Sequence, residues 1–287
     1  MNVRIAVSLG TSPLHREVFV DVITALASLG FDSVWVSDVL TGQGPDPIVA
    51  LSTAAQLDPK LKLGATLLLP GHNDLRLAKA LASLDVLSGG RLLLTFVPGL
   101  AHGPERDAIG VPVAQRAAAF ERTLPRLRNW WAGEQVDGIA LSPRPLQDPL
   151  EFWLGGLAPA SLERCGRLAD GWLGATCTPE QARAAKSTID AAAAAAARQV
   201  DVEHFGVSIG YAHSTAAAER LTAAGGRRPG APVPVGYSAL RETLLSFIEV
   251  GMSKFVVRLP APDDPDDPAA WRAELVGLAE AVVDLQT

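Results

Sequence analysis

The segment best suited to bind a ligand is Leu154–Ser161, which reads LGGLAPAS. It joins a short apolar strand to the start of a helix through two glycines. Free backbone N–H groups and the positive end of a helix favour an anion such as a phosphate. Gly155 and Gly156 also allow a ligand to approach the backbone closely. The alternative is a tight left-handed turn without a ligand. The segment is therefore the first candidate for a phosphate site.

The histidines and cysteines do not form a metal-binding pattern. No two of the five histidines are spaced as ligands on one strand or helix, which argues against a zinc or iron hydrolase. Cys165 and Cys177 form no ligand motif, and a disulfide-bridged secreted framework is not expected. His72 and His102 follow predicted strands and could act as an acid or base, although a solvated loop histidine is the commoner explanation. Asp38 is a better candidate for a polar ligand contact, with capping of the next turn as the alternative.

These candidates lie on a regular alternation of strands and helices. We expect strands at Arg4–Leu9, Ser33–Ser37, Leu61–Leu69, Arg91–Phe96, Phe152–Leu154, Gly171–Gly174, Phe205–Tyr211 and Lys254–Leu259. We expect helices at His15–Leu29, Pro47–Leu57, Asp74–Leu87, Val113–Trp131, Ala160–Leu168, from Thr178 onward, at Ala239–Val250 and at Pro268–Leu285. Such alternation implies parallel strands joined by helical crossovers.

Eight repeats in 287 residues favour one α/β domain, a closed (β/α)8 TIM barrel over residues 1–287 with short insertions at Ala132–Pro149 and Ala223–Pro234. An open doubly wound sheet is the alternative, but no glycine-rich fingerprint follows the first strand. In a barrel the reaction centre is built from loops at the carboxyl ends of the strands. The substrate is expected to contact the loops Leu40–Pro45 and Ala132–Pro149.

Composition limits the partners. The formal net charge of −6 argues against general nucleic-acid binding. No apolar run reaches the roughly 18 residues that a membrane span needs, and no signal-peptide pattern is found at the N-terminus. We therefore expect a cytoplasmic protein that binds neither nucleic acid nor a membrane.

Eight segments, in order along nearly the whole chain, resemble one known family. They are Phe31–Asp38 (FDSVWVSD), Pro47–Leu57, Leu61–Pro70, Ala78–Arg91, Glu105–Pro112 (ERDAIGVP), Arg116–Leu124, Trp153–Trp172 and Gly236–Val257. Each motif alone is loose, but the series is specific. The chain resembles the bacterial luciferase-like superfamily of flavin- and deazaflavin-dependent oxidoreductases.

This resemblance implies a barrel that holds a flavin-type ring at its carboxyl-end mouth. Family members bind the coenzyme phosphate with the loop after the fourth strand and the glycine turn after the fifth. They also carry a non-proline cis peptide bond behind the ring, which would fall here between Thr66 and Leu67. Together with Asp38, the cofactor-binding residues expected on this basis are Thr66, Leu67, Gly99, Gly155, Gly156, Leu157 and Ala158.

Two positions depart from the family pattern. Many relatives have a histidine directly after the aspartate that ends the second strand, whereas this chain has Val39 there. The loop after the fourth strand keeps only Gly99 of its usual glycines, and the preceding Pro98 has no N–H to donate. No residue is therefore assigned a catalytic role.

The leading hypothesis is an oxidoreductase that uses coenzyme F420 for hydride transfer to or from a small organic substrate, which rests on likeness to the deazaflavin branch. The first alternative is a luciferase-like monooxygenase that uses FMN. The second, suggested by the altered loop Val97–Leu100, is a non-catalytic barrel that has lost its cofactor. Likeness to the family also leads us to expect a homodimer.

Overall fold

The computed structural model describes residues 1–10, 12, 15–224 and 233–287, so most of the expected insertion Ala223–Pro234 lies outside the described residues. The strands are β1 Arg4–Ser8, β2 Ser33–Ser37, β3 Lys62–Leu68, β4 Leu92–Val97, β5 Phe152–Gly155, β6 Gly171–Ala175, β7 Phe205–Gly210 and β8 Lys254–Arg258. The helices are α1 Arg16–Ser28, α2 Pro47–Leu57, α3 Asp74–Ser88, α4 Gly103–Ala108, α5 Val113–Trp131, α6 Pro159–Leu168, α7 Pro179–Ala195, α8 Thr215–Ala224, α9 Gly236–Glu249 and α10 Pro268–Val282, followed by a 3-10 turn at Val283–Leu285.

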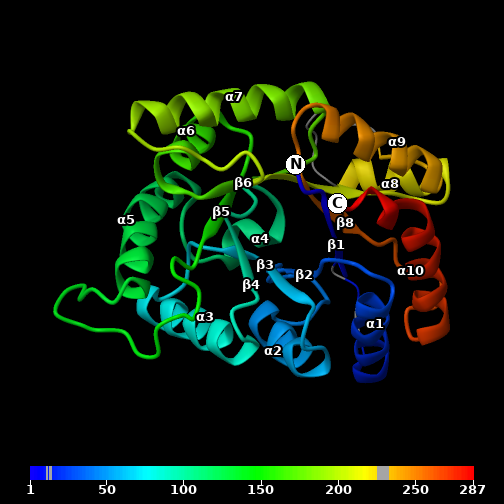
Figure 1. Ribbon diagram of the computed structural model, residues 1–287, viewed down its shortest axis with the longest axis horizontal. Coiled ribbons are helices and arrows are strands. Elements are labelled where there is room, and N and C mark those ends of the chain that lie inside the picture. The colour runs from blue at the N-terminus through cyan, green and yellow to red at the C-terminus, as the bar shows by residue number, and fades with distance from the viewer. Residues whose placement is uncertain (11, 13–14, 225–232) are drawn as a thin grey trace.

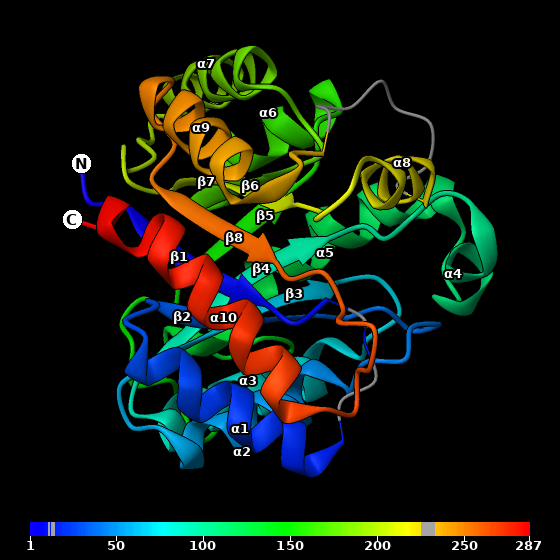
Figure 2. The same cartoon turned by 90° about the vertical axis from the view of Figure 1, so that its right-hand side faces the viewer.

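The strands form a closed parallel barrel in chain order, because β1 pairs with both β2 and β8. Helices surround the strands on the outside (Figure 1). Seen from the side, both chain ends lie at the amino end of the strands, and α4 and α8 lie beyond the carboxyl end (Figure 2). The expected (β/α)8 barrel is confirmed.

Two short helices were not expected from the sequence. The α4 helix has six residues, too few to show an apolar stripe. No element was predicted for most of the α8 helix, and its last two residues were placed in the insertion Ala223–Pro234, although its alanines favour helix. The last helix is also shorter than expected, because it tightens into a 3-10 turn at its end.

The centre of the barrel is filled by the side chain of Trp35. This residue is 2% exposed and packs with Ala6, Leu173 and Val256. Its partner across the sheet is Gly64, where a Cβ atom would lie 1.9 Å from the Trp35 ring, so any larger residue would displace the indole. Beyond Trp35, toward the carboxyl end, the strand register places mostly small or polar residues inward, among them Ser8, Ser37, Thr66, Thr95, Gly155, Ala175, Ser208, Gly210 and Arg258. We call this polar end of the barrel the mouth.

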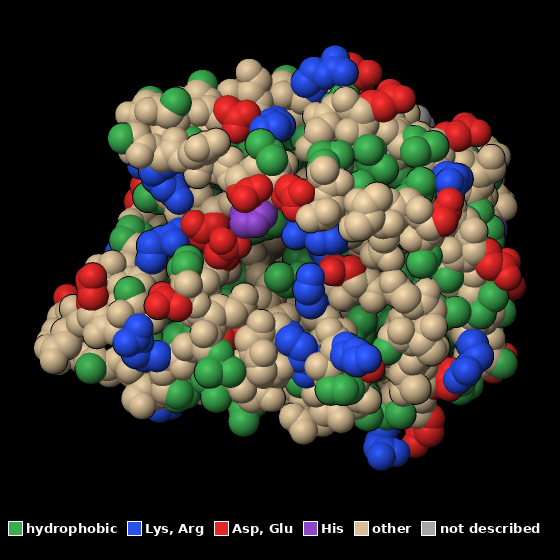
Figure 3. Space-filling view, in the orientation of Figure 1, with side chains coloured by type: hydrophobic (Ala, Val, Ile, Leu, Met, Phe, Trp, Pro, Cys, Tyr) green, Lys and Arg blue, Asp and Glu red, His purple; other side chains and the backbone are tan. Residues whose placement is uncertain are grey.

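The amino end of the barrel is closed by charged side chains. Lys254 is almost fully buried there, and its Nζ contacts the Asp32 carboxylate and lies 2.7 Å from Ser33 Oγ. Lys62 Nζ reaches the same carboxylate at 3.0 Å. Acidic and basic side chains alternate around a hollow near the centre of this face (Figure 3). Burial of a lysine is tolerated here because it is paired.

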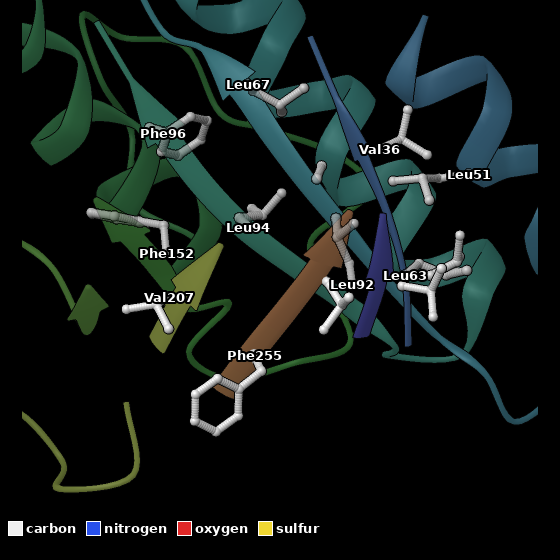
Figure 4. Close-up of a cluster of buried hydrophobic side chains, with 14 of the residues drawn as sticks. Val36, Leu51, Leu63, Leu67, Leu92, Leu94, Phe96, Phe152, Val207 and Phe255 are labelled. Atoms are coloured by element: carbon white, nitrogen blue, oxygen red, sulfur yellow. The ribbon is translucent and has the colours of Figure 1, made fainter. Parts of the chain in front are cut away.

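The outer faces of the strands form the main hydrophobic core. Leu67, Leu94, Phe96 and Phe152 point away from the barrel axis toward the helices, and the Phe96 and Phe152 rings lie 5.8 Å apart (Figure 4). Because neighbouring residues of a strand point to opposite faces, Thr66 and Thr95 point inward. This alternation provides the mouth with its polar groups.

The insertion Ala132–Pro149 does not contact the mouth, contrary to the expectation that it would meet the substrate. It follows a helix and precedes a strand, so it lies at the amino end of the barrel. There it packs on α3, where Lys79 Nζ donates to Ser142 O (2.8 Å) and Leu146 N donates to the Asp85 carboxylate (2.8 Å).

Candidate functional site

The glycine turn after β5 lies at the mouth and is tightly packed. A Cβ atom at Gly155 would lie 2.7 Å from Val97 Cγ1, so glycine is needed there. Gly156 has a φ of +115°, a conformation that side chains other than glycine rarely adopt. From outside the barrel, Trp172 Nε1 donates a 2.9 Å hydrogen bond to Gly156 O. The turn is therefore held in one shape by its neighbours.

The start of α6 is suited to a phosphate group. Its N-cap residue, Ala158, has no side-chain oxygen to cap the helix, and the first turn contains no acidic residue. The backbone N–H groups of Leu157 and Ala158 donate to no other described residue. Ala158 is exposed, so a ligand can reach these groups. Uncapped N–H groups at the positive end of a helix fit an anion.

Two threonines lie next to each other on the inner wall of the mouth. Thr66 Oγ1 accepts a 2.8 Å hydrogen bond from Trp35 Nε1, which leaves the Thr66 hydroxyl proton available to a ligand. Thr95 is paired with Thr66 across the sheet, and its buried hydroxyl has no partner among the described residues. An unpartnered buried hydroxyl is costly, so a ligand that bonds to Thr95 would be stabilising. The sequence reasoning missed Thr95, the one hydroxyl in an otherwise apolar strand.

The expected cis peptide bond between Thr66 and Leu67 is not found. Both cis bonds in the described residues precede prolines, Pro143 and Pro149. Strand β3 pairs with β4 without interruption from Leu63 to Leu68, so no bulge forms at this point. The Leu67 side chain belongs to the outer core, and only its backbone could contact a ligand in the mouth.

Asp38 and His72 come together at the rim of the mouth. His72 Nε2 lies 3.7 Å from Asp38 Oδ2, and the same carboxylate accepts a hydrogen bond from Leu68 N at 3.2 Å. The Asp38 side chain is 9% exposed and that of His72 is 39% exposed, so the imidazole is accessible while its carboxylate partner is sheltered. The pair can hold or move a proton at His72 Nε2. His102, by contrast, is exposed at the start of α4 and makes no side-chain capping bond.

The loop after β4 is organised by two buried charged residues. Arg116 is 2% exposed and donates hydrogen bonds to four backbone carbonyls, those of Pro98, Leu100, Arg106 and Val111. The Glu105 carboxylate accepts from Leu40 N (3.2 Å) and Thr41 Oγ1 (3.1 Å) in the loop after β2. Both residues lie in the segments that carry the family resemblance, but no role was predicted for them.

Gly99 packs inside this loop. Its φ is +76°, and a Cβ atom there would lie 2.3 Å from Ile109 Cδ1 and 2.9 Å from Leu68 Cδ2. The glycine therefore allows the loop to close over Ile109. This packing requires glycine whether or not a phosphate binds nearby.

A cavity of about 640 Å³ lies beside the mouth, between the loop after β3 and α5. His72 and Asp74 line it on one side, and Ile109, Gln115 and Arg122 line it on the other. It does not include the glycine turn after β5. His72, which lines this cavity, also lies 3.7 Å from Asp38 at the rim of the mouth.

In the described residues, no three side chains of the His, Cys, Asp or Glu type are grouped so as to hold a metal ion. No helix in the same part of the chain is long and apolar enough to cross a membrane.

Comparisons with known proteins identify the family. A model of the family described as "Luciferase-like monooxygenase" matches residues 3–233. The chain is 29% identical over 184 residues to a 5,10-methylenetetrahydromethanopterin reductase of Methanolobus tindarius, covering 60% of this chain and 55% of the relative. It is 26% identical over 175 residues to an F420-dependent glucose-6-phosphate dehydrogenase of Nakamurella multipartita, covering 53% and 50%.

The chain thus spans about half the length of the curated relatives it matches. Among solved structures, an F420-dependent secondary alcohol dehydrogenase in complex with an F420–acetone adduct matches with a TM-score of 0.80, covering 100% of both chains at 15% identity. At this identity the likeness shows the fold alone. Because the family model matches most of the chain, the protein belongs to the luciferase-like monooxygenase family.

Proposed function

We propose that this protein is an oxidoreductase that binds coenzyme F420 in the barrel mouth and acts on a small organic substrate. The observation that carries the proposal is the turn Gly155–Ala158, whose N–H groups open onto the uncapped start of α6. Relatives that include an F420-dependent dehydrogenase support the choice of coenzyme. When bound, the coenzyme supplies the hydride chemistry.

The chain itself would bind, orient and shield the reactants. The N–H groups of Leu157 and Ala158 would hold the coenzyme phosphate. Thr66 and Thr95 have hydroxyl groups on the inner wall that suit polar ring edges, and Trp35 closes the barrel below them and excludes water from that side. His72, whose Nε2 lies 3.7 Å from the Asp38 carboxylate, is the group best placed at the rim to exchange a proton with a substrate.

FMN is the alternative coenzyme, since the family description is that of monooxygenases. Its phosphate would occupy the same turn, so the turn does not distinguish the two. The purified protein should therefore be titrated with F420 and with FMN while quenching of coenzyme fluorescence is followed. Saturable binding of F420 but not FMN is the expected result. The reverse result would favour a monooxygenase, and failure of both would favour a non-catalytic barrel.

Substitution of Ala158 tests the phosphate site without damage to the fold. Ala158→Asp supplies the missing N-cap oxygen, so we expect the free energy of unfolding to rise by about 0.5–2 kcal/mol. The same carboxylate competes with a phosphate and repels it, so coenzyme affinity should fall at least about tenfold. Ala158→Asn is the matched neutral cap. It should stabilise the helix similarly but weaken binding less.

This combination separates binding from folding, because a variant that is more stable cannot lose the coenzyme through misfolding. Unchanged coenzyme affinity in Ala158→Asp would reject the assigned phosphate site.

We also propose that residues 1–287 act as one barrel domain in the cytoplasm and form a homodimer. The support is the resemblance to the family. Sedimentation of the purified chain tests the dimer, since its mass would be twice the 30.1 kDa of one chain.

A further inference from the structure

Arg258 extends into the mouth from the end of β8. Its Cα is paired with Ser8 on β1 and with Gly210 on β7, and it lies on the same inward face as Val256, which packs in the barrel centre. The side chain lies against two glycines. A Cβ atom at Gly210 would be 3.1 Å from Arg258 Nη2, and one at Gly10 would be 3.6 Å from Arg258 Cγ. The glycines make room for the guanidinium on this side of the mouth.

The Arg258 guanidinium has no hydrogen-bond or ion-pair partner among the described residues. The eleven remaining positions of the chain contain no Asp or Glu, so no carboxylate there can pair with it either. The side chain is open to solvent, yet burial lowers the pKa of Arg258 with no opposing charge. One side of the side chain packs against Gly10 and Gly210, and another side is open to solvent. It remains a cation at neutral pH.

No other arginine in the described part of the chain combines these properties. Arg76, Arg183 and Arg220 also make no ion pair, but they lie on exposed helix surfaces where water solvates the charge. The buried Arg116 instead donates to four carbonyls. A partly desolvated cation without a partner costs free energy in the folded chain. A ligand anion would remove that cost.

We propose that Arg258 binds an anionic oxygen group of the substrate, a carboxylate or a phosphate. This inference rests on the proposed function and names the class of substrate. In the closed ring, β4 lies directly across from β8, and β5 follows β4. The phosphate turn after β5 is thus on the far side of the mouth, so the anion at Arg258 is a second one. A guanidinium binds either group through two parallel hydrogen bonds.

The test uses the full chain without coenzyme, and inorganic phosphate and malonate as probes in titration calorimetry. Arg258→Gln should weaken malonate binding at least about tenfold, because the charge and both donors of the fork are lost. It should also remove the phosphate binding that persists in Ala158→Asp, in which the turn after β5 is blocked. Arg258→Lys keeps the charge and should lose less. Arg76→Gln removes an unpaired arginine from an exposed helix surface and is the matched control, with affinity expected within about twofold of the original.

Thermal unfolding gives a second readout that a merely structural role would not produce. If Arg258 is an unpaired binding group, Arg258→Gln should unfold at the same temperature as the original chain or higher. A clear loss of stability, restored in Arg258→Lys, would instead indicate a structural role and overturn the proposal. So would the absence of measurable binding of either probe at millimolar concentration.

Coenzyme titration of Arg258→Gln identifies the source of the anion. Unchanged coenzyme affinity supports a substrate group. If coenzyme affinity falls as much as probe affinity, Arg258 binds the coenzyme and the substrate assignment is wrong. If the original chain binds the probes through Arg258 but binds neither F420 nor FMN, the anion site stands and the proposed function fails.

Discussion

Trp172 supports the glycine turn after β5 from outside the barrel, through the hydrogen bond from its Nε1 to Gly156 O (2.9 Å). The indole is fully buried and lies over Gly174, where a Cβ atom would be 2.3 Å from the ring. One aromatic residue on β6 thereby positions a backbone carbonyl at the end of β5. The shape of the turn is set by residues that no coenzyme would touch.

Trp172→Phe should loosen this turn. Loss of the hydrogen bond and of part of the ring should lower the free energy of unfolding by about 1–3 kcal/mol. Because the turn is then less firmly oriented, coenzyme affinity should fall by up to about tenfold. Urea unfolding and coenzyme titration measure the two effects.

Trp130→Phe is the matched control. Trp130 is equally buried, and its Nε1 donates to Ile139 O (3.0 Å) at the other end of the molecule. A similar loss of stability with unchanged coenzyme affinity is expected. Equal loss of affinity in both variants would show that Trp172 acts through overall stability.

Arg116→Leu should destabilise the loop after β4. The substitution keeps the apolar stem but leaves the carbonyls of Pro98, Leu100, Arg106 and Val111 without their donor. We expect a loss of about 2–4 kcal/mol in the free energy of unfolding. Because the loop borders the mouth, hydrogen exchange should rise first in residues 98–111. Unchanged exchange there would mean that the loop is held by other contacts.

Asp32→Asn should strongly destabilise the amino end of the barrel. Lys254, 3% exposed, would lose the one charged partner that it has among the described residues, and a buried unpaired charge typically costs about 3–5 kcal/mol. The double variant Asp32→Leu with Lys254→Met removes both charges and should be more stable than Asp32→Asn alone. Denaturant unfolding of the three chains tests the order. If Asp32→Asn is as stable as the original chain, the ion pair between Asp32 and Lys254 does not stabilise the fold.

The same pair predicts a dependence on pH. Burial alone would raise the pKa of Asp32, but the charges and hydrogen bonds of Lys254 and Lys62 hold it well below its usual value of 3.8. The folded chain therefore binds fewer protons than the unfolded chain in acid, so the contribution of Asp32 is complete above about pH 4 and is lost below it. The stability difference between the original chain and Asp32→Asn should shrink as the pH falls below about 4. A constant difference would contradict this.

The two cysteines should not react with thiol reagents in the folded chain at neutral pH. Burial raises the pKa of Cys165 to about 12 and that of Cys177 to about 11, and both side chains are buried. The reactive thiolate is therefore scarce as well as inaccessible. Both thiols should be labelled after unfolding in guanidinium. Rapid labelling of the native chain would show that one of them becomes exposed.

Local sequence was sufficient for most of the fold. The bounds of β2, α2 and α5 were predicted correctly, because a cap residue, proline or a clear apolar stripe marks their ends. The helix α4 was missed because tertiary bonds from Glu105 and Arg116 hold it in place. The insertion Ala132–Pro149 was assigned to the wrong end because its place follows from chain direction and not from composition.

The sequence predicted only those parts of the site that are formed by residues adjacent in the chain. The turn Gly155–Ala158 is a contiguous segment, and its glycines and helix start can be recognised in sequence. The contact between Asp38 and His72 depends on the register of β2 with β3, which one sequence does not specify. Arg258 is a charged residue at the end of an apolar strand. That it has no ion-pair partner among the described residues is evident only in the folded barrel. The cis bond at Thr66–Leu67 was expected from likeness alone and was wrong.

The Trp35 indole has a consequence for the order of events in turnover. Because the indole blocks the barrel below Thr66 and Thr95, a coenzyme or substrate could enter and leave the mouth only from the carboxyl end of the strands. Of two ligands that share this opening, the one that binds deeper would therefore have to bind first and dissociate last, and the second ligand would have to leave before it.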